Sequence, residues 1–126
     1  MPGTVLIVDD DPLIRFVLAE LLADERYQPI VAADGHEALA YLHTADELPD
    51  LILLDLGMPR LDGWQFRQAQ REDPRLAAIP VVLLSAAHEL GNSAATLKVP
   101  EYLAKPIRAA HLLDVVERYC VHARGC

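Results

Sequence analysis

The segment LILLDLGMP, residues 51–59, places one acid at the end of an apolar run. Five of the six residues from 51 to 56 are apolar, and Asp55 is the exception. A continuous apolar run of this kind is typical of a strand that is covered on both faces of a parallel sheet. Gly57 and Pro59 then favour a turn. The segment therefore predicts a buried strand over 51–54 that leads directly into the Asp55 carboxylate.

Strand-like apolar runs alternate with helix-like patterns on both sides of this segment. The expected strands cover 4–8, 29–33, 51–54, 79–85 and 101–104. The expected helices cover 12–25, 36–45, 62–72, about 89–98, and a last segment with Leu112, Val115, Val116, Tyr119 and Cys120 at helical spacing. Asp11 and Pro12 form a strong helix start, as N-cap and first helical residue. Five such strand–helix units predict an α/β fold, a doubly wound five-stranded parallel sheet with five helices on its two faces.

The fourth helix, about residues 89–98, is the weakest of the five. Gly91 costs about 1 kcal/mol relative to alanine inside a helix, and Asn92, Ser93 and Thr96 add some tenths each. A segment of about ten residues with these losses is not stable without packing. Pro100 then ends any helix before it. We expect this helix to be short, frayed or displaced.

Size and charge limit the class of protein. The 126 residues, 52% of them hydrophobic, fit one domain. Because the chain has neither a signal peptide pattern nor an apolar run of about 20 residues, we expect a cytoplasmic protein without membrane contact. The net charge of −8 argues against direct nucleic-acid binding, which needs clustered Lys and Arg. Cys120, His122 and Cys126 match no standard zinc spacing.

Polar residues gather at the carboxyl ends of the expected strands, where ligand sites lie in open parallel sheets. The first strand is followed by Asp9, Asp10 and the helix cap Asp11, the third by Asp55, the fourth by Ser85 and the fifth by Lys105. Neighbouring carboxylates repel each other unless a proton or a cation neutralises them. Oxygen ligands of this kind suit Mg²⁺. The set is suited to phosphoryl transfer, with Asp55 as nucleophile and with Lys105 and Ser85 holding phosphoryl oxygens.

Four motifs in the sequence resemble those of a known family. The segments VLIVDDDP, LILLDLGMPRLDGW, PVVLLSA and YLAKP occur in this order, and together with their spacing they resemble the receiver domain of two-component response regulators. The resemblance covers about residues 4–122. It implies a flavodoxin-like fold with strand order 2-1-3-4-5. We expect a single receiver domain over 1–126 without an output domain, because nothing follows the last helix in this sequence.

The resemblance also implies a role for each site residue. Asp55 is similar to the aspartate that accepts a phosphoryl group from the phosphohistidine of a histidine kinase or phosphotransfer protein. Asp10 resembles the direct Mg²⁺ ligand and Asp9 a ligand that acts through water, while the backbone carbonyl of Gly57 resembles a further ligand. Lys105 resembles the family's lysine beside the phosphoryl group.

Two further residues resemble the family's switch. Ser85 corresponds to the switch hydroxyl and Tyr102 to the switch aromatic, although Tyr102 also fits plain core packing. Phosphorylation would then alter a surface that binds a downstream protein, and a homodimer is one such assembly. The protein would be no enzyme on other substrates, because it catalyses only its own phosphorylation and dephosphorylation.

Three other functions compete with this interpretation. A phosphohydrolase with an aspartyl-phosphate intermediate needs a second acid two residues after the nucleophile, and that position is Gly57. A flavodoxin-like cofactor carrier needs a phosphate-binding loop after the first strand, where three aspartates would repel a phosphate. A receiver-like interaction module that is not phosphorylated remains the main alternative, and the complete residue set speaks against it.

Overall fold

The computed structural model describes residues 3–55, 63–86 and 101–123. In chain order its elements are β1 (Thr4–Val8), α1 (Pro12–Asp24), β2 (Gln28–Ala32), α2 (Gly35–Thr44), β3 (Leu51–Asp55), α3 (Gly63–Glu72), β4 (Val81–Ala86), β5 (Glu101–Lys105) and α5 (Ala109–Ala123). Four of the five expected helices are therefore present. The other, at about 89–98, lies outside the described residues and stays a prediction.

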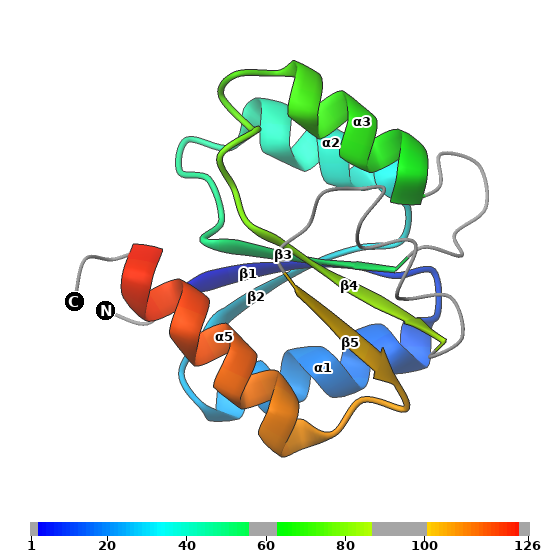
Figure 1. Ribbon diagram of the computed structural model, residues 1–126, viewed down its shortest axis with the longest axis vertical. Helices are drawn as coiled ribbons and strands as arrows, with labels where there is room; N and C mark the ends of the chain where they lie inside the picture. The colour runs from blue at the N-terminus through cyan, green and yellow to red at the C-terminus, as the bar shows by residue number, and fades with distance from the viewer. Residues whose placement is uncertain (1–2, 56–62, 87–100, 124–126) are drawn as a thin grey trace.

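The five strands form one parallel sheet in the order β2-β1-β3-β4-β5. Helices α1 and α5 cover one face of this sheet, and α2 and α3 cover the other (Figure 1). The doubly wound architecture and the strand order predicted from the sequence are confirmed. Pro29, which cannot donate a ladder hydrogen bond, lies in the edge strand β2, where a proline is tolerated.

Buried side chains sort into two clusters because successive residues of a strand point to opposite faces. One half-core packs against α2 and α3, and its strand residues are Leu6, Val8, Ala32, Ile52, Leu54, Val81 and Leu83. The other half-core packs against α1 and α5, and its strand residues are Val5, Ile7, Leu51, Leu53, Val82, Leu84 and Leu103. The central strands β1 and β3 contribute to both, so they are buried on both faces as the apolar run at 51–54 predicted.

Strand β4 begins at Val81, two residues later than the sequence pattern suggested. The Ile79 amide donates a hydrogen bond of 3.1 Å to the Leu76 carbonyl, so Ile79 belongs to the turn before the strand. Gln70 of α3 reinforces this turn by donating to the carbonyls of both Leu76 and Ile79, each at 3.0 Å. The Gln70 side-chain oxygen in turn accepts from Arg67, and burial lowers the pKa of the Arg67 guanidinium.

Gly3 packs tightly against Cys120, near the end of α5. A Cβ atom added to the buried Gly3 would lie 2.6 Å from the Sγ and 2.8 Å from the Cβ of Cys120. It would also lie 2.9 Å from the Asp50 carboxylate. Because the Asp50 carboxylate accepts a hydrogen bond from the Thr4 amide at 2.9 Å, it is not free to move aside.

We therefore expect Gly3→Ala to lower the free energy of unfolding by about 1–3 kcal/mol, the usual cost of overpacking. Urea denaturation measures this loss as a lower midpoint at unchanged slope. In a Cys120→Ala background the same substitution should cost less, since one of the clashing atoms is gone. An unchanged midpoint for Gly3→Ala in the otherwise unaltered chain would contradict the prediction.

Within the described ranges, none of the helices combines the length and the apolar character that a membrane crossing requires.

Candidate functional site

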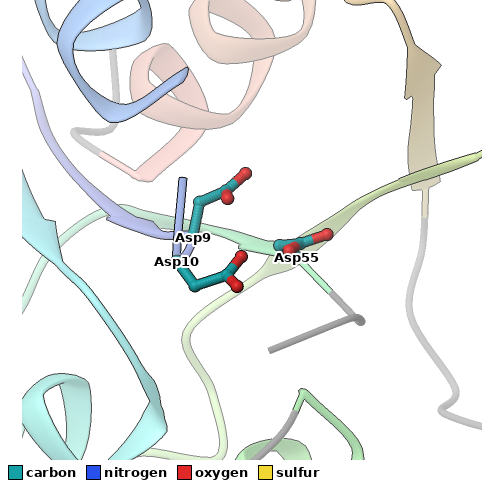
Figure 2. Close-up of side chains that lie close together, drawn as sticks. All are labelled: Asp9, Asp10 and Asp55. Carbon is teal, nitrogen blue, oxygen red and sulfur yellow. The ribbon is translucent and has the colours of Figure 1, made fainter. Parts of the chain in front are cut away.

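Three carboxylates meet where the two central strands end. Asp9 and Asp10 directly follow β1, and Asp55 is the last residue of the neighbouring strand β3. One carboxylate oxygen from each of the three lies within 4.8 Å of the others. Figure 2 shows the three side chains grouped beyond the ends of the two strands. Asp9 and Asp55 are buried and Asp10 is exposed, so the cluster opens to solvent on the Asp10 side.

The turn between β1 and α1 holds Asp9 and Asp11 through hydrogen bonds. The Asp9 carboxylate accepts a hydrogen bond of 2.9 Å from the Asp11 amide. The Asp11 carboxylate caps α1, because it accepts from the amides of Leu13 at 2.9 Å and Ile14 at 3.5 Å. The prediction that Asp11 is an N-cap and not a member of the cluster is therefore confirmed. On the other side, the Asp9 amide donates to the Ala32 carbonyl of β2 at 3.2 Å.

The chemistry of this donor set fits a hard divalent cation. Three ionised carboxylates at this separation repel one another, and burial of Asp9 and Asp55 weakens the screening by water. A cation that binds oxygen ligands removes the repulsion without changing any protonation state. Mg²⁺ is satisfied by one or two protein carboxylates and keeps several of its own water molecules. The exposed Asp10 leaves room for such waters, so the residues present fit Mg²⁺.

The backbones of two further predicted site residues, Ser85 and Lys105, lie at the same edge of the sheet. Ser85 follows Leu84, the β4 residue that is opposite Asp55, and Lys105 ends β5 opposite Ala86. Their backbone positions agree with the expected placement at strand ends. The side chains of Ser85 and Lys105 and the whole of Gly57 lie outside the described part of the chain, so the roles assigned to them stay predictions.

Tyr102 had two interpretations, as a core residue and as a switch residue. It lies in β5 opposite Leu83, and 45% of it is exposed. This exposure does not fit core packing. The ring borders a hollow that is also lined by Pro106, Arg108 and His111 at the start of α5. The switch role of Tyr102 stays a prediction.

Two features beside the acids were missing from the sequence interpretation. Arg15 of α1 donates a 2.8 Å hydrogen bond from Nη1 to the backbone carbonyl of Asp9. The apolar stripe of α1 is also not all core, since only Leu18 and Leu22 are buried while Leu13 is 68% exposed. Two signals in the sequence pointed to these features. Arg15 lies in the first turns of the helix that follows the acids. The apolar stripe of α1 is wider than a helix needs if it buries only two residues.

The exposed part of that stripe forms one wall of an apolar groove. Leu13, Val17 and Leu21 of α1 line one side, and Pro106 and Ile107, which connect β5 to α5, line the other. Phe16, at 62% exposure, lies on the same helix. Leu13 lies in the first turn of α1, three residues after Asp10, so the groove begins at the end of α1 that follows the acids of β1.

Comparisons with known proteins agree with this geometry. A sequence model described as the response regulator receiver domain matches residues 5–117. A 14.6 kDa protein of Leptolyngbya boryana is 35% identical over 119 residues, which cover 93% of this chain and 89% of that protein. Other relatives are longer, and the chain spans 41% and 56% of two of them.

Solved structures give the same result. The chemotaxis protein CheY4 of Vibrio cholerae superposes with a TM-score of 0.83 at 30% identity, covering 94% of this chain and 99% of that one. The receiver domain of the Pseudomonas aeruginosa sensor histidine kinase PA1611, with a magnesium ion coordinated in its active site cleft, superposes with a TM-score of 0.84 at 26% identity and covers 95% and 98% of the two chains. By sequence, fold and the acids at its strand ends, this chain belongs to the receiver domain family of response regulators.

Proposed function

We propose that this receiver domain accepts a phosphoryl group on Asp55 from the phosphohistidine of a histidine kinase or phosphotransfer protein. The observation that carries the proposal is the acidic cluster, in which oxygens of Asp9, Asp10 and Asp55 lie within 4.8 Å of one another at the ends of β1 and β3. A lone buried Asp55 would have no use for two further acids at this distance. A site that brings a cation and a phosphoryl group together requires them.

Mg²⁺ is the cofactor we propose for this site. Asp10 and Asp55 would hold it directly, Asp9 would act through a water molecule, and the Gly57 backbone carbonyl would complete the protein ligands. When bound, Mg²⁺ supplies positive charge that offsets the carboxylates and the phosphoryl oxygens. The magnesium ion in the similar PA1611 receiver domain supports this choice.

The reaction needs little more than positioning and charge. An Asp55 carboxylate oxygen attacks the phosphorus, the P–N bond of the phosphohistidine breaks, and its electron pair stays with the leaving imidazole. The product is an acyl phosphate on Asp55. Lys105 and Ser85 hold the phosphoryl oxygens as negative charge shifts onto them. In this scheme the domain acts only on itself and is not an enzyme for other substrates.

The phosphorylated state would be read by another protein. Ser85 would follow the phosphoryl group and Tyr102 would change its environment at the surface of β5, which the 45% exposure of Tyr102 allows. The partner would be a protein, as expected for an acidic domain of net charge −8, and cytoplasmic like its kinase. A homodimer remains one form of such a complex.

The apolar groove beside α1 supports a protein donor over a small molecule as the natural source of phosphate. A partner helix with an apolar face can cover Leu13 and Val17 and hold its phosphohistidine over the adjoining acids. A few residues that are buried near the centre of an interface carry most of its binding energy. The groove would therefore bind the helix of the kinase or phosphotransfer protein that carries the histidine.

We expect Leu13→Glu to slow phosphoryl transfer from a protein donor at least roughly tenfold, because a charge in the groove costs on the order of 1.4 kcal/mol of binding. Phosphorylation by acetyl phosphate should stay unchanged, since the acids are untouched. The donor is the kinase that phosphorylates the wild-type protein fastest. Ala40→Glu, which adds the same charge to exposed surface on α2, is the matched control. Equal rates for the two variants with the protein donor would refute the docking site.

The function itself is tested with acetyl phosphate and Mg²⁺. Intact-mass spectrometry should show one added phosphoryl group that appears only with the divalent ion and is lost on treatment with hydroxylamine, which cleaves acyl phosphates. Absence of the adduct with both acetyl phosphate and a panel of phosphorylated kinases would favour the unphosphorylated interaction module.

A further inference from the structure

The β1–α1 turn contains a hydrogen bond between the Arg15 side chain and the Asp9 backbone. Arg15 lies in the first turns of α1, and its guanidinium reaches back six residues to the carbonyl oxygen of Asp9 at 2.8 Å. That carbonyl belongs to the peptide that joins Asp9 to Asp10. Arg15 is half-buried, so the bond is partly protected from competition by water.

Asp9 is consequently held at three points. Its amide donates to the Ala32 carbonyl at 3.2 Å, its carboxylate accepts from the Asp11 amide at 2.9 Å, and its carbonyl accepts from Arg15. The contact with the Asp11 amide closes a turn around the Asp9–Asp10 peptide and limits its rotation. The contact with Arg15 adds a side-chain restraint on the carbonyl of that same peptide and so holds its plane. The direction of the exposed Asp10 carboxylate depends on it, because Asp10 follows immediately.

We propose that Arg15 is a positioning residue of the Mg²⁺ site, which locks the Asp9–Asp10 peptide and thereby aims the Asp10 carboxylate. This inference rests on the proposed function, since the hydrogen bond from Arg15 affects Mg²⁺ binding only if Asp10 binds the ion. Partners that orient metal ligands commonly contribute 10–100-fold to metal affinity, and Arg15 would be such a partner acting through the backbone.

The positive charge of Arg15 allows a positioning role to be distinguished from a simple electrostatic effect on Mg²⁺ binding. Guanidinium is always protonated, and beside the cluster its positive charge repels a dication. If Arg15 acted by charge alone, removing it would strengthen Mg²⁺ binding. If it acts by holding the peptide, removing it weakens Mg²⁺ binding in spite of the relieved repulsion. The two accounts predict changes of opposite sign.

Lysine at this position separates geometry from charge. Arg15→Lys keeps the positive charge and the length of an extended chain, but it replaces a rigid planar donor by a flexible single ammonium group. We expect Arg15→Lys to bind Mg²⁺ with an affinity between those of the wild-type protein and Arg15→Ala. It also remains interpretable if Arg15→Ala does not fold.

The experiment is a Mg²⁺ titration of the full chain, followed by NMR shifts of the amides of Asp10 and Asp11. We expect the dissociation constant for Mg²⁺ to rise about tenfold or more in Arg15→Ala and by less in Arg15→Lys. In metal-free Arg15→Ala, these amide signals should already be shifted or broadened. Arg118→Ala is the control, because Arg118 is an exposed arginine on α5 that pairs with Asp114 at 3.5 Å.

Each outcome decides the matter. An unchanged or tighter dissociation constant in Arg15→Ala, or in Arg15→Lys if only that variant folds, overturns the positioning role. An equal loss in Arg118→Ala overturns it too, since the loss would then not depend on the contact with the Asp9 carbonyl. If the wild-type protein itself shows no response to millimolar Mg²⁺, the proposed metal site is wrong. The hydrogen bond from Arg15 to Asp9 then has no role in metal binding.

Discussion

Asp55→Ala is expected to abolish phosphoryl incorporation completely. The substitution removes the nucleophile itself, and the remaining acids of the cluster are poor substitutes. The Asp9 carboxylate is buried and accepts a hydrogen bond from the Asp11 amide. Asp10, which follows β1, would have to bind Mg²⁺ and accept the phosphoryl group at the same time. After incubation with acetyl phosphate and Mg²⁺, intact-mass spectrometry should show one phosphoryl adduct on the wild-type protein and none on the variant.

The buried position of Asp55 requires a second variant in this test. Asp55 is 6% exposed, so alanine leaves a small cavity beside the site. Asp55→Asn preserves the shape and also removes the charged nucleophile, and it should give the same loss. Asp11→Asn, which changes the acid that directly follows Asp10 but lies outside the cluster, should be labelled like the wild-type protein. Full labelling of Asp55→Ala would show that another side chain is the acceptor.

Asp10→Asn is expected to weaken Mg²⁺ binding by about 100-fold, at the upper end of the 10–100-fold effect that is typical of an outer-shell partner. The substitution removes one negative charge and one direct ligand from the exposed side of the cluster. Asp11→Asn should bind Mg²⁺ like the wild-type protein, because Asp11 caps α1 and asparagine is an equally good N-cap. The titration follows Trp64, which is exposed at the start of α3, by fluorescence.

The same Asp10→Asn variant should become more stable when Mg²⁺ is absent. Neutralising one of three crowded carboxylates relieves their repulsion in the folded state, and in the unfolded chain the acids are well screened. A higher melting temperature without metal and a smaller stabilisation by added Mg²⁺ are therefore expected together. Unaltered Mg²⁺ affinity in Asp10→Asn would remove Asp10 from the ligand set.

The sheet and the acidic cluster were predictable from the sequence because both depend on regular patterns. Apolar runs mark the buried strands, and parallel strands bring their carboxyl ends to one edge, which placed Asp9, Asp10 and Asp55 together. The strand order was less accessible: it followed from the family resemblance, because alternation of strands and helices fixes no order.

Other features depend on three-dimensional packing that no periodicity encodes. A leucine at helical spacing has the same pattern whether it enters a core or contacts a partner, so the wide apolar stripe did not show that Leu13 is among its exposed residues. The hydrogen bond from Arg15 depends on the angle at which α1 leaves β1. The start of β4 at Val81 was missed because the Ile79 amide is used by a turn, and an apolar pattern carries no information about amide partners.

The separation of the interior into two half-cores has a consequence for how such domains diversify. Substitutions in contact couple, whereas those without shared partners add independently. A lineage can therefore remodel the layer of α1 and α5, which carries the exposed groove, while the packing of α2 and α3 stays as it is. New partner preferences then arise without a compensating change across the sheet, and the acids between the two layers keep their geometry.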